Sequence, residues 1–115
     1  MVDGRPPTGD ELLRALSALS NPHRLRIVAA LTGGTTYVSQ LARDLGMSRP
    51  LLHMHLQRLE AAGLVRGRME VSEDGKAMRF CEVTEFAFQI DPAEIVRATK
   101  TLSEPASSGS SSKEK

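Results

Sequence analysis

The chain has 115 residues, of which 40% are hydrophobic and 25% charged, and its formal net charge is +1. This length allows one domain with a modest core, and the balanced charge means that any signal for nucleic acid has to be local. The single cysteine, Cys81, excludes an internal disulfide framework and a cysteine-only metal site. No stretch approaches the roughly 18 apolar residues that a membrane span needs, so we expect a cytoplasmic protein.

Three regions are predicted along the chain. Residues 1–9 form a flexible N-terminus, and residues 10–103 carry the alternation of apolar and polar residues that is typical of a folded domain. Residues 104–115 are rich in serine and have little to bury, which predicts a disordered tail.

Two helices are predicted before residue 33. The first covers residues 10–19 with Asp10 as its N-cap, and its apolar residues recur at helical spacing: Leu12, Leu13, Leu16 and Leu19. Ser20-Asn21-Pro22 restarts the chain, because Asn21 can cap the next helix and Pro22 suits the first helical position. Gly33 and Gly34 end that second helix.

A third helix is predicted over about residues 37–45, with Thr36 as a candidate cap, and a fourth from Ser48 to about Ala62. After Gly63 the pattern alternates in two runs separated by SEDG, which predicts a β-hairpin over residues 64–84. Residues 86–90 (FAFQI) alternate too, and two alternatives stay open for them: a third short strand or an extended arm. Asp91-Pro92 then starts a last helix. The predicted fold is mainly α with a small β-hairpin (α+β).

The spacing within residues 38–56 is typical of a helix-turn-helix. Two helices that cross steeply need a small residue where their backbones approach, and Ala42 stands there. The turn needs a residue that tolerates positive φ, and Gly46 follows four positions later. A basic surplus runs through residues 36–68. Together with the hairpin, these features favour a DNA-binding unit over an ordinary pair of helices.

The segments LSNPHRLRIVAAL and VSQLARDLGMSRPLLHMHLQRLEAAGLV, with the hairpin after them, resemble the winged helix-turn-helix transcriptional regulators of the ArsR type. The resemblance covers about residues 12–84. It implies a homodimeric repressor that binds a pseudo-palindromic operator through the helix at 48–62 and the hairpin wing at 64–84, and that releases it on a signal.

Helical geometry separates a core side from a reading side within residues 48–62. Leu52, Leu56 and Leu59 lie within about 60° of each other and form the core side. The residues expected to contact DNA lie opposite or at the start of the helix: Ser48, Arg49, Pro50, His53, Met54, Gln57 and Arg58. In a winged helix this face lies in the major groove, where Gln pairs with adenine and Arg with guanine. Pro50 departs from the small polar residue usual in the family and offers only apolar contact.

Further basic residues are candidates for contacts with phosphates or the minor groove: Arg43, Arg68, Lys76 and Arg79. Such contacts position a protein on DNA but carry little sequence information, and for each of these residues a plain exposed charge is the alternative.

Neither known type of metal site of this family is expected here. The two positions that carry cysteines in one family site read Tyr37 and Ser39, and no histidine follows His55 for the other. His53 and His55 lie about 200° apart on a helix, so they do not share an ion. We expect His55 to be half-buried with a hydrogen bond. No metal, cofactor or enzymatic centre is predicted, and Cys81 is interpreted as a packed residue.

Apolar stripes on the first and last helices predict a dimer interface: Leu12, Leu16, Leu19, Ile95, Thr99 and Leu102. The alternative is that these residues pack on their own domain. The predicted partners are double-stranded DNA and a second copy of the chain, with an unknown small molecule or protein as a further effector. The rival hypothesis for function is a winged-helix protein-interaction module without specific DNA binding.

Overall fold

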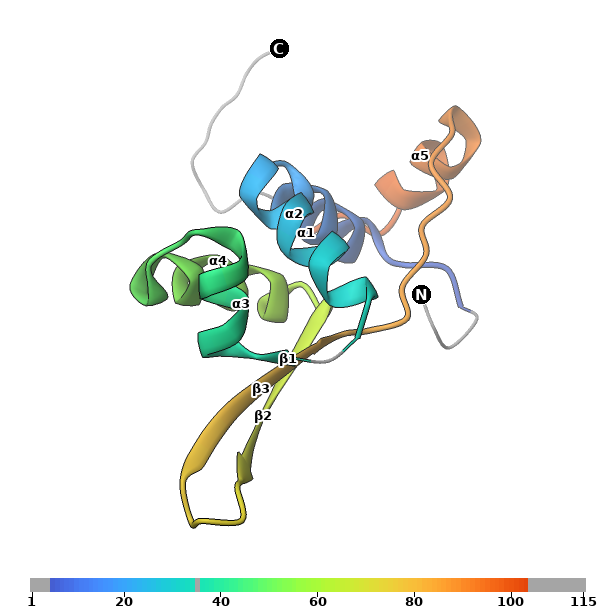
Figure 1. Ribbon diagram of the computed structural model, residues 1–115. Coiled ribbons are helices and arrows are strands. Elements are labelled where there is room, and N and C mark those ends of the chain that lie inside the picture. The colour runs from blue at the N-terminus through green and yellow to red at the C-terminus, as the bar shows by residue number, and fades with distance from the viewer. Residues whose placement is uncertain (1–4, 35, 104–115) are drawn as a thin grey trace.

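The computed structural model describes residues 5–34 and 36–103. In chain order it contains helices α1 (Gly9–Leu19) and α2 (Pro22–Thr32), strand β1 (Thr36–Tyr37), helices α3 (Val38–Leu45) and α4 (Arg49–Ala61), strands β2 (Val65–Val71) and β3 (Ala77–Val83), and helix α5 (Pro92–Thr99). Helices α1 to α4 pack together, and the β2–β3 hairpin extends away from them (Figure 1). The predicted mainly α fold with a β-hairpin is confirmed. The predicted tail, 104–115, and residues 1–4 of the predicted N-terminus lie outside the described residues.

The start of α1 differs from the prediction. The cap is Thr8, whose Oγ1 accepts a hydrogen bond from the Glu11 N–H at 3.1 Å, while the Glu11 carboxylate accepts one from the Thr8 N–H at 2.9 Å. This reciprocal pair satisfies two backbone donors that the helix leaves free. Asp10 therefore lies inside the helix, where its carboxylate accepts from the Ser103 N–H at 3.0 Å. The prediction of Asp10 as the cap is wrong, although Thr8-x-x-Glu11 carries the signature of the true start.

The predicted starts of α2 and α5 are confirmed. Asn21 Oδ1 accepts from the N–H groups of His23 and Arg24, at 2.8 Å and 3.3 Å. Asp91 Oδ1 accepts from the Glu94 N–H at 2.8 Å. Each of these side-chain oxygens replaces a backbone acceptor that the first turn of the helix lacks. Because the contact joins residues only two or three positions apart, the local sequence predicts where these helices begin.

The sheet has three antiparallel strands in the order β1-β3-β2. Its third strand comes not from residues 86–90, which form no strand, but from Thr36 and Tyr37, which pair with Cys81 and Phe80. Thr36 is thus a strand residue, and its prediction as a cap is wrong, since α3 begins after Tyr37 without a side-chain cap. The pairing joins residues far apart in the chain.

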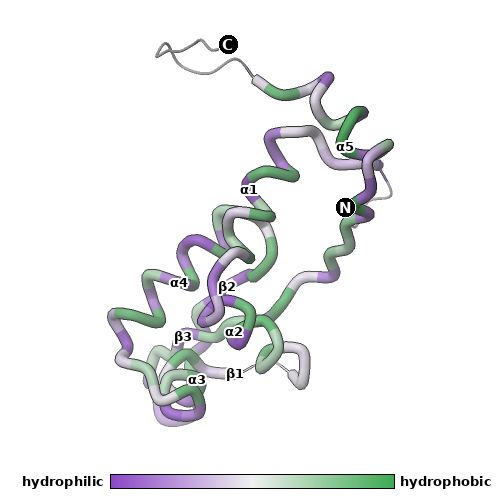
Figure 2. The backbone as a smooth tube through the Cα atoms, turned by 90° about the horizontal axis from the view of Figure 1, so that it is seen from above, coloured by the Kyte–Doolittle hydropathy of each residue, from purple (hydrophilic) through white to green (hydrophobic). Residues whose placement is uncertain are grey.

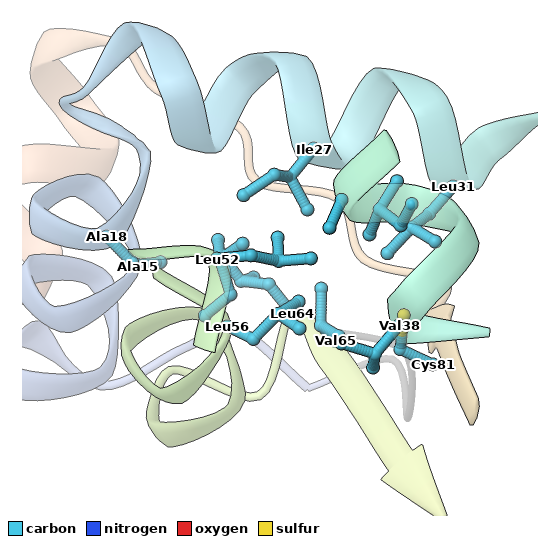
Figure 3. Packing of buried hydrophobic residues seen from close by; sticks show 13 residues of the cluster. Ala15, Ala18, Ile27, Leu31, Val38, Leu52, Leu56, Leu64, Val65 and Cys81 are labelled. Carbon is cyan, nitrogen blue, oxygen red and sulfur yellow. The ribbon is translucent and has the colours of Figure 1, made fainter. Parts of the chain in front are cut away.

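A single hydrophobic core joins the first four helices to the base of the hairpin. Figure 3 shows Ile27 of α2 directed toward Leu52 and Leu56 of α4, with Leu64 beside them where the hairpin begins. Leu52, Leu56 and Leu59 are all fully buried, which confirms the predicted core side of α4. Packing on this one side orients α4 and leaves its opposite side in solvent, so hydrophobic and hydrophilic residues alternate along it in Figure 2.

Residues 84–91 form an extended arm that carries the chain from β3 to α5 (Figure 1). Phe86 and Phe88 pack against the core, with ring centroids 6.0 Å apart. Helix α5 then contacts the start of α1, where the Gly9 N–H donates to Thr101 Oγ1 at 2.7 Å. A Cβ atom at Gly9 would overlap the carbonyl oxygen of Ala98, so glycine permits this close approach of the terminal helices.

His55 is buried between α4 and the junction of α1 with α2. Its side chain is 3% exposed, and its Nδ1 accepts a hydrogen bond from Arg24 Nη1 at 3.2 Å. Arg24 Nε also donates to the carbonyl oxygen of Ala18 at 2.7 Å, and the His23 ring centroid lies 5.4 Å from that of His55. The expected hydrogen bond is present, but the ring is fully rather than half buried. Its Nε2 has no hydrogen-bond partner within the described part of the chain.

We expect the free energy of unfolding to decrease as the pH falls below about 6.5, the ordinary pKa of histidine. Burial, followed by the positive charges of Arg24, His23 and Arg58, lowers the pKa of His55 in the folded protein. Between the folded and unfolded pKa values the unfolded chain binds more protons, so acid favours unfolding until the folded pKa is passed. Urea denaturation at a series of pH values measures this loss.

Replacement His55→Leu removes the titrating ring and should flatten the pH profile in that window. His53→Gln changes a histidine on the outer side of the same helix and should retain the wild-type profile. An undiminished loss of stability in His55→Leu would assign the acid sensitivity to other groups.

Candidate nucleic-acid interface

The turn between α3 and α4 has the geometry predicted from its spacing. Gly46 has a φ of 64° and lies in the left-handed region that favours glycine. The Met47 N–H then donates to the carbonyl oxygen of Ala42 at 2.9 Å, which closes the end of α3. Ser48 Oγ accepts from the Leu51 N–H at 3.3 Å and starts α4. These contacts hold α4 across α3 as the second helix of a helix-turn-helix.

The predicted reading residues meet on the outer side of α4. One shallow hollow of about 420 Å³, called here the reading hollow, is lined by Arg49, Pro50, His53, Met54 and Gln57. Met54 is 45% exposed. Within the described residues, the side chains of Arg49, His53 and Gln57 form no hydrogen bond or ion pair. The hollow therefore combines free polar groups with an exposed apolar centre.

A second hollow, called here the wing cleft, lies between α4, the start of α3 and the hairpin. It measures about 610 Å³ and is lined by Val38, Ser39, Arg49, His53, Met69, Lys76, Ala77, Met78 and Arg79. The lining contains three cations and no acidic residue. Arg79 Nη2 lies 3.5 Å from the Glu60 carboxylate, an ion pair between the hairpin and α4. Three of the predicted basic contacts, Arg49, Lys76 and Arg79, are thus brought together.

Arg68 lies on the other face of the hairpin. Met69 pairs with Arg79, and because side chains alternate along a strand, Arg68 points away from the face that Arg79 occupies. Its guanidinium donates to Glu70 at 2.8 Å and to Glu82 at 3.0 Å, and it covers the Phe80 ring 4.8 Å from the centroid. The structure does not bring Arg68 to the wing cleft.

The remaining predicted contacts line neither of these two hollows. Arg43 is exposed on α3 and donates to Gln40 Oε1 at 2.6 Å. The hydroxyl of Ser48 is engaged as the cap of α4, while Arg58 is exposed in the last turn of that helix. A role for these residues in binding stays a prediction.

The terminal helices present apolar side chains to solvent, but not all of those predicted. Leu12 is buried and Leu19 packs against the protein's own core, whereas Leu16, Ile95, Thr99 and Leu102 are exposed. Leu13, which is 57% exposed, and Val96 are further exposed apolar residues of these two helices, and the predicted interface left them out. Helical periodicity identifies the apolar residues of α1, but it does not show which of them face the core. Their burial depends on how α4 and α5 pack against α1.

Cys81 is buried, and its Sγ lies 3.6 Å from the carbonyl oxygen of Thr36. Burial, reinforced by the negative charge of Glu60, raises the pKa of this thiol to about 11. At neutral pH the reactive thiolate is therefore scarce. In the residues that the structure describes, no three His, Cys, Asp or Glu side chains gather where they could hold a metal ion. The helices of that part are also too short and too polar for any of them to span a membrane.

Comparison with known proteins places this geometry in a family. A family model for a helix-turn-helix domain matches residues 19–68. The chain is 37% identical over 81 residues to the uncharacterized HTH-type transcriptional regulator MJ0229 of Methanocaldococcus jannaschii, covering 70% of this chain and 84% of that protein. It is 39% identical over 69 residues to the HTH-type transcriptional regulator CmtR of Mycobacterium tuberculosis, covering 60% of this chain but spanning only 55% of CmtR.

A solved structure resembles the fold over about three quarters of the chain. It is the homodimeric winged helix-turn-helix DNA-binding domain of Mb0332 from Mycobacterium bovis, a possible ArsR-family transcriptional regulator. The TM-score is 0.59 at 26% sequence identity, over 76% of this chain and 70% of that one. With the turn at Gly46, the exposed face of α4 and the hairpin beside it, these matches show that the chain belongs to the winged helix-turn-helix transcriptional regulators of the ArsR type.

Proposed function

We propose that this chain is a sequence-specific DNA-binding transcriptional regulator that acts in the cytoplasm as a homodimeric repressor on a pseudo-palindromic operator. The observation that carries this proposal is the convergence of Arg49, Pro50, His53, Met54 and Gln57 in one exposed hollow on α4. An α-helix fits the major groove, so this face of α4 meets the base edges. The resemblance of the chain to named transcriptional regulators favours this function over a protein-interaction module.

The wing cleft supports the same placement of DNA. When α4 lies in the major groove, the sugar-phosphate strand that borders the groove passes beside the helix. Arg49, Lys76 and Arg79 line the space between α4 and the hairpin. Cations there attract the phosphates of that strand and position the protein without reading sequence.

A homodimer follows from the needs of recognition and from the exposed apolar residues of α1 and α5. One helix reads too few base pairs for useful specificity, whereas two related by a two-fold axis read half-sites about one helical turn apart. Leu13, Leu16 and Val96 lie in solvent in the single chain, and a second copy would cover them. The Mb0332 domain, which is homodimeric and binds DNA, supports this arrangement by analogy.

We expect the affinity for duplex DNA to fall steeply with salt, and two substitutions to separate its components. Lys76→Ala removes a phosphate contact and should reduce the slope of log affinity against log salt by about 0.9, for all sequences alike. Gln57→Ala removes a base contact and should weaken binding to the preferred sequence by about 1–3 kcal/mol with little change in slope. Fluorescence anisotropy at several salt concentrations measures both.

Lys100→Ala is the matched control, because Lys100 is an exposed lysine at the end of α5, outside both hollows. It should bind DNA as the wild type does. Absence of DNA binding by the wild type even at low salt would contradict the proposed function.

A further inference from the structure

The centre of the reading hollow is apolar, since Pro50 and Met54 line it together. Pro50 and Met54 are four residues apart on α4 and therefore neighbours on its outer side. Arg49 and His53 lie toward the start of the hollow and Gln57 toward its end. We propose that Pro50 and Met54 bind the C5-methyl group of a thymine, so that the regulator selects a T·A pair at one position of each half-site. This inference rests on the proposed function.

The first turn of α4 argues against a phosphate as the group that lies on Pro50. Helix N-termini bind phosphate through their free backbone N–H groups. Here Pro50 has no N–H, and the N–H of Leu51 donates to Ser48 Oγ at 3.3 Å. The N-terminal end of α4 thus offers few backbone donors to an anion. The side chains that line the reading hollow therefore determine what the hollow binds.

Among the groups that DNA presents in the major groove, the thymine methyl is the one that is apolar. The other base edges carry hydrogen-bond donors and acceptors, which lose their bonds to water when they are covered by proline or methionine. The exposed side chain of Met54 has three rotatable bonds and adapts to a methyl group without strain. Contact with thymine removes apolar surface from water on the methyl group and on the two side chains.

The spacing along α4 of the residues that line the hollow fits this assignment. An α-helix rises about 1.5 Å per residue, so residues 50 to 57 span about 10 Å, or about three base pairs at 3.4 Å each. The methyl group then lies at the central pair. Arg49 and Gln57, whose side chains have no hydrogen-bond partner within the described chain, face the pairs on either side, where arginine pairs with guanine and glutamine with adenine.

The test starts from the sequence that the wild-type protein selects from random duplex DNA. Each thymine of one half-site is then replaced in turn by uracil, which lacks only the C5-methyl group. We expect one position at which the affinity falls about fourfold, as burial of one methyl-sized group predicts. At that position cytosine should bind more weakly than thymine, and 5-methylcytosine should recover about the same factor over cytosine.

The same DNA pairs are then measured with Met54→Ala and Pro50→Ala. Both residues are exposed, so the fold should persist, and an unchanged melting temperature verifies this. If Met54 and Pro50 share the contact with the methyl group, the ratio of thymine to uracil affinity should fall below fourfold in each variant, because one of the two coupled partners is gone. Leu25→Ala removes an exposed apolar residue of α2, outside the hollow, and should keep the fourfold ratio.

The outcomes separate this inference from the function on which it rests. If no thymine is sensitive to uracil, or if the sensitive thymine stays so in both variants, the methyl contact is overturned while DNA binding stands. If the wild type selects no sequence at all, the proposed function fails and the methyl contact fails with it.

Discussion

If the proposed dimer forms through the terminal helices, Leu13→Glu is expected to convert it into monomers and to weaken operator binding by a factor of about 10² to 10⁴, the range lost when two linked binding events become separate. Leu13 is 57% exposed on α1 in the single chain, beside α5. A glutamate there suits an isolated helix in water but buries an unpaired charge when two copies meet. The protomer should keep its fold, and only assembly and cooperative binding should be lost.

Sedimentation equilibrium measures the mass, and anisotropy measures binding to whole and half operators. Leu25→Glu is the control, because Leu25 is 53% exposed on α2 and does not belong to the apolar surface of the terminal helices. It should remain dimeric with wild-type affinity. A Leu13→Glu protein that stays dimeric would locate the interface elsewhere.

Leu52→Ala is expected to lower the free energy of unfolding by about 2–5 kcal/mol. The side chain of Leu52 is 0% exposed and lies in the core cluster between α2 and α4 (Figure 3). Truncation loses its buried surface and leaves a cavity that a packed core fills only in part. Since small domains are stable by only about 5–15 kcal/mol, this single change brings the fold close to its limit.

Met54→Ala provides the contrast on the same helix, two residues away. Because Met54 is exposed, its truncation should change stability by no more than about 0.5 kcal/mol. Urea denaturation of both variants gives the comparison. Equal losses of stability would mean that the outer side of α4 contributes to the fold, and its assignment as a reading surface would lose its basis.

The features that the sequence predicted correctly depend on contacts between residues close together in the chain. The caps at Asn21 and Asp91 and the turn at Gly46 depend on atoms a few residues apart, so sequence patterns predicted them. The inner and outer sides of α4 follow from the period of an α-helix, and the five residues of the reading hollow were predicted together for that reason.

Other features depend on segments that meet only in the folded chain. Strand β1 exists because Thr36 and Tyr37 find β3, a pairing across more than 40 positions that no local pattern encodes. Which of the apolar residues of α1 are buried depends on where α4 and α5 pack, so Leu12 was assigned to a dimer surface and Leu13 was not. The placement of Arg68 on the far face of the hairpin likewise required the register of β2 with β3.

The amino-acid sequence by itself determined the helices, the sharp turn at Gly46 and the division of α4 into two sides, because each results from short-range sterics and hydrogen bonds. Only the tertiary structure decided which residues far apart in the chain become neighbours. It buried His55 against Arg24, brought Lys76 and Arg79 next to Arg49 in the wing cleft, and joined Gly9 to Ala98 between the terminal helices. These contacts come from packing a common core, in which the position of every element depends on all the others.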